Sequence, residues 1–74
     1  MIQSNYNEYT TINKSISVFV PFVNVSHIQK GDVVTNERTL TNSSWIHFHN
    51  GKCVHVEEPY HEVVADFKDY LDNL

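Results

Sequence analysis

Hydrophobic and polar positions alternate most clearly between residues 45 and 56 of this chain. Two strand-like runs, 45–49 and 52–56, flank the dipeptide Asn50-Gly51. Asn-Gly between such runs is a strong signal for a two-residue type I′ turn, because both central residues of that turn need positive φ angles. The pattern therefore predicts a β-hairpin over residues 45–56.

A two-residue loop fixes the cross-strand partners of this predicted hairpin. The pairs are His49 with Lys52, Phe48 with Cys53, His47 with Val54, Ile46 with His55, and Trp45 with Val56. Opposite residues share a face of a sheet. One face is therefore predicted to carry Ile46, Phe48, Cys53 and His55. The other face is predicted to carry Trp45, His47, His49, Lys52, Val54 and Val56.

Apolar residues recur at helical spacing in residues 57–74. The stripe comprises Tyr60, Val63, Val64, Phe67, Tyr70, Leu71 and Leu74. Pro59 suits the first helical position, and Glu57 and Glu58 favour the positive end of the helix dipole. The spacing predicts an amphipathic helix that packs on the apolar hairpin face. The alternative use of the stripe is a contact with another protomer or a partner.

The pattern before residue 45 predicts shorter elements. A short strand is expected around residues 6–12, followed by a turn at residues 13–15. Residues 16–20 are apolar on both faces, which predicts a strand covered on both sides. At Pro21 this strand either ends or lies at a sheet edge. The remaining expectations are a tight turn or bend at 24–28, a turn at 30–32, a strand from residue 33 and a polar mobile loop over 35–44.

Together these elements predict a single α+β domain over residues 1–74. Its architecture is a small antiparallel sheet of three or four strands with an Asn-Gly hairpin, packed on a C-terminal amphipathic helix. Residues 1–14 are expected to be flexible, and residues 57–74 to hold the helix. A chain of 74 residues is near the lower size limit for a core that is stable without staples or partners. This favours a homo-oligomer.

The composition predicts a soluble, cytoplasmic protein. No apolar run approaches the roughly 20 residues that cross a bilayer, so no membrane association is expected. The first residues lack the cationic and apolar segments of a signal peptide. Cys53 is the only cysteine and cannot form an internal disulfide, which fits a reducing compartment.

The charge is unevenly distributed along the chain. Of the net charge of −4, residues 57–74 contribute −5, because six acidic residues there face only Lys68, and residues 1–56 contribute about +1. Without a cluster of lysine and arginine, binding to nucleic acid through phosphates is not expected. The acidic helix face is either solvated or the contact surface for a basic protein.

Five histidines raise a metal hypothesis. His47 and His49 project from one face of the predicted strand, a spacing that occurs in zinc sites, and His61 is the next candidate ligand. His27, Glu57 and Glu58 are alternatives that only tertiary contacts could supply. Because His55 is predicted on the opposite face, we expect no metal and no cofactor. Partly exposed histidines would instead make partner binding pH-sensitive.

A Cys–His pair is the other candidate for chemistry. Cys53 and His55 share a predicted face, which would suit a nucleophile and its base, but cysteine is more often a small buried hydrophobe. The sequence has no phosphate-binding loop, dinucleotide fingerprint or nucleophile elbow. We therefore expect that the protein is not an enzyme.

Residues 46–63 carry a pattern found in a known family. They read Ile46-x-Phe48-x-Asn50-Gly51-Lys52, then Val56-x-Glu58, then Glu62-Val63. This resembles the FlbD/SwrD-like small flagellar proteins, whose pattern runs I-x-L-x-N-G-K, then V-x-E-S, then E-V in a short helix. Residues 23–28 resemble the family's Asn-centred turn. The resemblance implies a non-enzymatic accessory module that acts on a larger protein assembly, and it transfers no catalytic residue.

The favoured functional hypothesis is a protein-binding module. Its predicted contact residues are Trp45, His47, His49, Glu62, Asp66 and Asp69. Trp45 is the expected anchor, with a core position capping the hairpin as its alternative. One variant is a phage- or mobile-element-encoded inhibitor of a host protein. The alternatives are capture of a metal or small ligand by the histidine-rich hairpin, with His61 or Tyr60, and a DNA mimic built on the acidic helix face.

Overall fold

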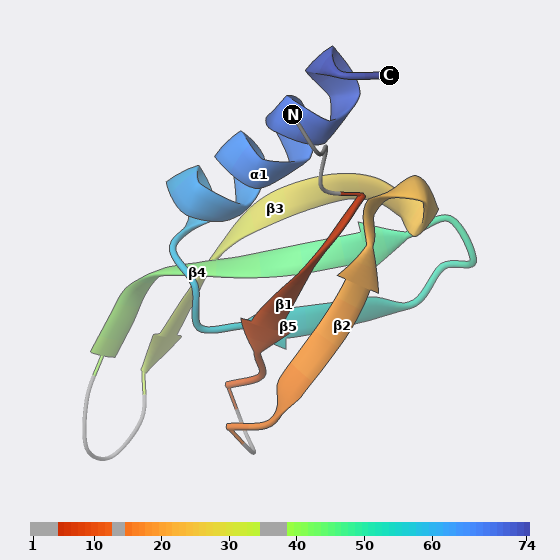
Figure 1. Ribbon diagram of the computed structural model, residues 1–74. Coiled ribbons are helices and arrows are strands. Elements are labelled where there is room, and N and C mark those ends of the chain that lie inside the picture. The colour runs from red at the N-terminus through yellow and green to blue at the C-terminus, as the bar shows by residue number, and fades with distance from the viewer. Residues whose placement is uncertain (1–4, 13–14, 35–38) are drawn as a thin grey trace.

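The computed structural model describes residues 5–12, 15–34 and 39–74 (Figure 1). Its elements are, in chain order, β1 (Tyr6–Thr10), β2 (Ser17–Pro21), a 3-10 turn (Phe22–Asn24), β3 (Val25–Val34), β4 (Thr39–Phe48), β5 (Cys53–Val56) and α1 (Tyr60–Asp72). The predicted α+β class is confirmed, because antiparallel strands and a C-terminal helix make up the described part of the chain.

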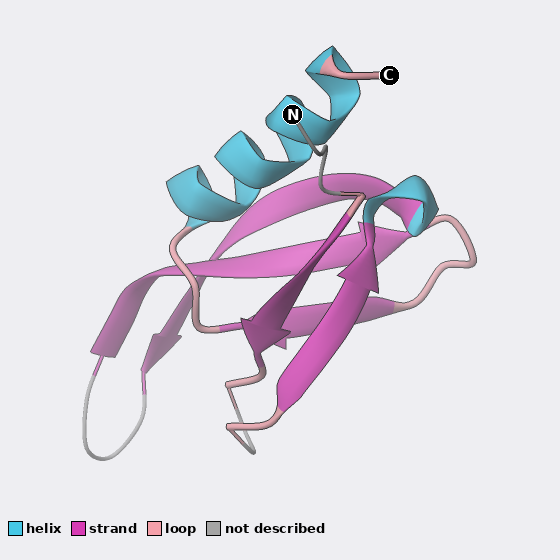
Figure 2. Ribbon diagram, in the orientation of Figure 1, coloured by secondary structure: helices cyan, strands magenta, loops and turns pink. Residues whose placement is uncertain are grey.

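The strands form two antiparallel sheets, one of β1 and β2 and one in the order β3–β4–β5. α1 lies along β3 and β4, and the β1–β2 hairpin crosses β5 (Figure 2). An isolated bridge between Thr11 and Val56 joins the two sheets. The amide of Ile12 also donates a hydrogen bond to the carbonyl of His55 at 3.1 Å.

The core lies between the two sheets and the helix. Its buried members come from every strand and from α1: Tyr9, Val20, Phe22, Val25, Ile46, Val56, Val63 and Tyr70. Each such side chain contributes about 1.5–3 kcal/mol when fully buried. Their wide separation in sequence means that the core forms only when both sheets and the helix come together.

The hairpin predicted at Asn50-Gly51 is present as β4–β5, but its register differs by one residue from the prediction. Ile46 pairs with Val54 rather than His55, and His47 pairs with Cys53. The cause is the loop, because the Phe48 amide donates to the Lys52 carbonyl and closes a three-residue loop, 49–51. Gly51 has a φ of 88°, and Asn50 is not among the described residues with positive φ. This is the turn with a G1 bulge rather than type I′.

This shift of one residue moves every β5 side chain to the other face of the sheet. Val54 and Val56 now join Ile46 on the core side. Cys53 and His55 lie on the outer side with Trp45 and His47, as their pairing requires. The faces predicted from a two-residue loop were therefore wrong for β5.

The largest difference between predicted and observed secondary structure lies within residues 25–44, where strands replace predicted turns and part of a predicted loop. The turn expected at 30–32 is part of β3, where the pairing with β4 is irregular between Gly31 and Val33. Residues 39–44, expected in a mobile loop, begin β4 instead. Backbone pairing with β3 holds this part of β4, and the hydroxyls of Ser43 and Ser44 have hydrogen-bond partners of their own.

The N-terminal strands follow the prediction in position but not in burial. β1 lies within the expected segment, and the predicted turn at 13–15 falls partly outside the described residues. β2 corresponds to the predicted strand 16–20, but only one of its faces is covered. Val20 is fully buried, whereas Phe19, on the opposite face of the strand, is 55% exposed. Ile16, which precedes the strand, is exposed as well.

The C-terminal helix begins and ends close to the predicted positions. Pro59 precedes it as the N-cap residue. Val63 and Tyr70 are buried, and Phe67 packs against the core. The last part of the predicted apolar stripe, Leu71 and Leu74, remains exposed.

Candidate functional site

The outer side of the β3–β4–β5 sheet carries four of the residues that the sequence suggested for function, Trp45, His47, Cys53 and His55. Trp45 stacks on His55 with ring centroids 4.0 Å apart. His55 Nε2 lies 2.8 Å from the hydroxyl of Ser43. Gly31 makes room for both rings, since a Cβ there would lie 2.6 Å from Trp45 Cδ1 and 2.9 Å from His55 Nε2. The cluster therefore ties the three strands of this sheet together.

The Ser43–His55 pair has the distance of a catalytic dyad but not its chemistry. The Ser43 hydroxyl donates its proton to the carbonyl of Gly31, so His55 Nε2 must be the donor to Ser43. Ser43 is also fully buried and cannot meet a substrate. Burial lowers the pKa of His55 below its ordinary value of 6.5, which favours the neutral ring. The pair stabilises the sheet.

The histidines proposed as metal ligands are distributed over separate parts of the molecule. His47 stacks on His27 at 4.2 Å and hydrogen-bonds Gln29 through Nε2. His49 is exposed beside the hairpin loop, and His61 is exposed in the first turn of α1. Within residues 5–12, 15–34 and 39–74, no group of three or more His, Cys, Asp or Glu side chains is placed to hold a metal ion.

Cys53 is an exposed free cysteine, not a buried hydrophobe. It lines a groove of about 440 Å³ together with Trp45, His55 and residues at the start of β2, including Ile16. Trp45 is half-buried on the outer side of the sheet. It is therefore neither the core residue nor the fully exposed anchor that the sequence suggested.

The acidic residues of α1 differ in their surroundings. Glu62 and Asp69 are exposed, and Asp66 is half-buried. Asp66 Oδ2 accepts hydrogen bonds from the hydroxyl of Tyr9 at 2.8 Å and from Nδ2 of Asn7 at 2.9 Å. Burial first, and then the hydrogen bond to Asp66, raise the pKa of Tyr9 well above its ordinary value of 10. Asp66 therefore fastens α1 to β1.

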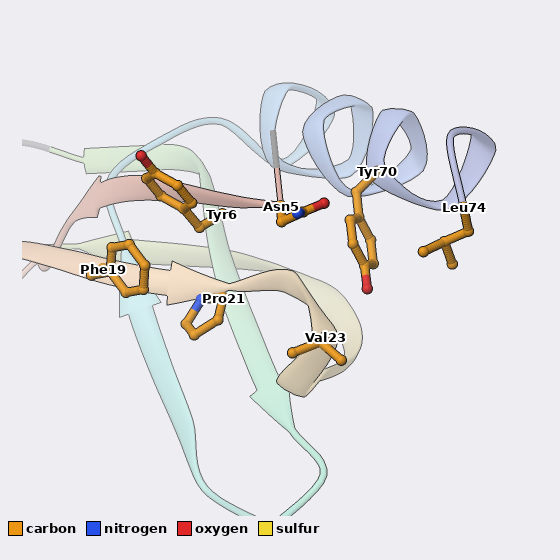
Figure 3. A pocket seen from close by; sticks show the side chains of 7 residues that line it. All are labelled: Asn5, Tyr6, Phe19, Pro21, Val23, Tyr70 and Leu74. Atoms are coloured by element: carbon orange, nitrogen blue, oxygen red, sulfur yellow. The ribbon is translucent and has the colours of Figure 1, made fainter. Parts of the chain in front are cut away.

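An apolar groove that the sequence did not reveal lies between the β1–β2 hairpin and the end of α1 (Figure 3). It has a volume of about 470 Å³ and is lined by Asn5, Tyr6, Phe19, Pro21, Val23, Tyr70 and Leu74. The Tyr6 and Phe19 rings are in contact, with centroids 4.7 Å apart. Val23 and Leu74 are 66% and 81% exposed. Exposed apolar residues gathered in this way mark interaction surfaces.

The groove is held by residues fixed on both sides. The amide of Phe22 donates to the carbonyl of Asn5 at 2.9 Å, which holds the start of β1 against the end of β2. Both Glu58 carboxylate oxygens accept from the amide of Thr10, at 2.9 and 3.1 Å. This contact ties β1 to the segment that leads into α1. Both contacts hold β1, whose first residue Tyr6 lines the groove.

A smaller polar cleft adjoins this groove. Its volume is about 120 Å³, and its lining residues are Tyr6, Asn7, Phe22, Asp66 and Asp69. Tyr6 lines both hollows. Two of the residues that the sequence suggested for partner binding, Asp66 and Asp69, thus lie beside the apolar groove. Trp45, His47 and His49 do not line it.

The groove was missed because its residues are far apart in sequence. The one signal that could have indicated the groove is Phe19, an aromatic residue on the face of β2 opposite to Val18 and Val20. The sequence pattern predicts that this face of the strand is covered, whereas in the structure the Phe19 ring contacts Tyr6 at the surface.

No protein-family model, no curated protein and no solved structure matches this chain. The resemblance to the FlbD/SwrD-like family therefore stays a prediction. In the described part of the chain, no helix has the length and apolar character needed to cross a membrane.

Proposed function

We propose that this chain is a non-enzymatic protein-binding module that docks onto a larger protein through the apolar groove at Tyr6, Phe19, Pro21, Val23 and Leu74. The observation that carries the proposal is the clustering of exposed apolar side chains around one hollow. An apolar patch of this kind is stabilised when a partner covers it.

The groove suits binding because it is preorganised. Val20 and Phe22, which neighbour Phe19 and Val23 along the chain, are buried in the core. Tyr70 reaches the groove from α1 and contacts Phe22, with ring centroids 5.6 Å apart. A partner would therefore pay little conformational entropy to order this surface.

A different protein is a better occupant than a second copy of this chain. The groove is bordered by Asp66 and Asp69, and the molecule carries a net charge of −4. Symmetric dimers bury the same patch of both subunits. Such a dimer here would bring two acidic surfaces together, at a cost from like-charge repulsion. Self-association through another surface stays a prediction.

Two more specific versions of this proposal are a flagellar accessory protein and a phage-encoded inhibitor. A flagellar accessory protein and a phage-encoded inhibitor would each need a docking surface and no catalytic site. Both versions predict that mutation of the groove abolishes function while leaving the fold intact.

A capture experiment with matched variants tests the proposal. Phe19→Ser and Ile16→Ser remove apolar side chains of nearly equal exposure, 55% and 54%, but only Phe19 lines the groove. We expect wild type and Ile16→Ser to capture the same protein from a lysate of the source cells, and Phe19→Ser to lose it. The captured protein, once purified, should perturb the NMR signals of Tyr6, Val23 and Leu74.

Trp45→Ala distinguishes the apolar groove from the contact surface predicted from the sequence, in which Trp45 is the anchor. If Trp45→Ala loses the partner and Phe19→Ser retains it, the docking surface is the outer side of the sheet and the present assignment is wrong. Circular dichroism and thermal unfolding of each variant verify that the fold is kept.

A further inference from the structure

The apolar groove continues into an acidic cleft, and Tyr6 forms the boundary between them. In Figure 3 the Tyr6 and Phe19 rings lie together at one end of the groove, and Tyr70 and Leu74 lie at the other. On the other side of Tyr6 is the cleft lined by Asp66 and Asp69. A segment seated in the groove would therefore lie beside a carboxylate pair on the other side of Tyr6.

The carboxylates of this cleft come from Asp66 and Asp69, which are three residues apart on α1 and so lie on one side of the helix. Among the residues that the structure describes, no lysine or arginine lines the cleft. Both hydrogen bonds described for the Asp66 side chain end on Oδ2, and Asp69 is exposed.

We infer that the segment bound by this protein is cationic as well as apolar: an aliphatic or aromatic side chain fills the groove, and a neighbouring lysine or arginine crosses Tyr6 to reach Asp66 and Asp69. This inference rests on the proposed function and names the partner's chemistry. Long basic side chains bury their methylene stems along apolar surface while their charge meets a polar group. The Tyr6 ring also favours a cation nearby.

The charge of the whole molecule supports the same occupant. Residues 57–74 carry −5, so a basic segment is attracted toward this end of the molecule and an acidic one is repelled. The complementarity distinguishes a cationic segment from a purely apolar one, which the groove alone would also accept.

Selection from a displayed library of random peptides tests the inference with wild-type protein as the immobilised target. The peptides retained should be enriched both in large apolar residues and in lysine or arginine, relative to the input library. Phe19→Ser should lose both enrichments.

A matched pair of charge variants locates the cation. Asp69→Asn and Asp72→Asn each remove one negative charge from exposed positions of α1, but only Asp69 lines the cleft. For a selected peptide, we expect Asp69→Asn to weaken binding about two- to fivefold, as for an exposed ion pair. Asp72→Asn should leave the affinity nearly unchanged. Added salt should reduce the difference between wild type and Asp69→Asn.

The possible results separate this inference from the function on which it rests. Apolar peptides without enrichment of lysine or arginine would overturn the inference and leave the docking surface in place. Equal weakening by Asp69→Asn and Asp72→Asn would also overturn it, because the attraction would then be non-specific. If the groove retains no apolar peptide, the proposed function itself fails.

Discussion

Tyr9→Phe is the substitution that most directly tests how α1 is fastened to the sheets. The Tyr9 side chain is 2% exposed, and its hydroxyl donates to Asp66 Oδ2 at 2.8 Å. A hydrogen bond to a charged group contributes about 1.5–3 kcal/mol to stability. Asp66 is half-buried and keeps its bond to Asn7, so water can replace part of the lost interaction. We expect the free energy of unfolding to fall by about 1.5 kcal/mol.

Urea and thermal unfolding followed by circular dichroism measure this change. For a domain of this size, the expected loss corresponds to a decrease in Tm of about 6–12 °C. Tyr6→Phe is the matched control on the same strand, because Tyr6 is 52% exposed. Its effect should stay within about 0.5 kcal/mol, as for most surface substitutions.

Burial of the Tyr9 side chain, together with its hydrogen bond to Asp66, raises the pKa of Tyr9 and predicts how stability depends on pH in the alkaline range. The raised pKa of Tyr9 means that folding favours its protonated form. The contribution is complete below pH 10, the ordinary pKa, and is lost as the pH rises above it. Tyr9→Phe should remove this alkaline loss. If Tyr9→Phe changes neither the free energy of unfolding by more than about 0.5 kcal/mol nor the alkaline profile, the bond to Asp66 does not stabilise the fold as argued here.

Three further outcomes are expected. Gly31→Ala should destabilise the fold by about 1–3 kcal/mol through overpacking, since the new Cβ would press on Trp45 and His55; unchanged thermal unfolding and Trp45 fluorescence would contradict this. Gly51→Ala should lower the free energy of unfolding by about 1–2 kcal/mol. The cost comes from the positive φ alone, since no atom lies within 4 Å of the added Cβ. Chemical denaturation measures this change, and an unchanged stability would refute the G1 bulge. His55 has a lowered pKa, so the unfolded chain binds the proton more readily and stability should fall as the pH decreases below 6.5; His55→Gln should reduce this acid-dependent loss, and an unchanged acid profile would count against burial of the ring.

The elements with strong local signals could be predicted from the sequence. The apolar stripe of residues 57–74 predicts α1 because its spacing is set by the helix itself. The Asn50-Gly51 dipeptide predicts the hairpin because few residues tolerate the backbone angles of its loop. In the polar stretch before Trp45 the local pattern failed, since the strand there depends on backbone pairing between β4 and β3.

The candidate site was only partly accessible to the same reasoning. Asp66 and Asp69 were named for their charge, and the structure places them beside the apolar groove. Trp45 and His47 were named for their chemistry and lie on the outer side of the other sheet, where each stacks on a histidine. The groove residues Tyr6, Phe19 and Leu74 had no shared pattern along the chain.

Helical periodicity and turn chemistry act over a few residues, so the α+β class, the hairpin and the helix follow from local patterns in the sequence. Which side of β5 faces the core, and where apolar side chains remain at the surface, depends on long-range packing. A single residue in the loop reverses every side chain of a strand. Likewise, the groove is lined by segments that are far apart in the sequence, around Tyr6, Phe19 and Leu74, and only packing brings them together.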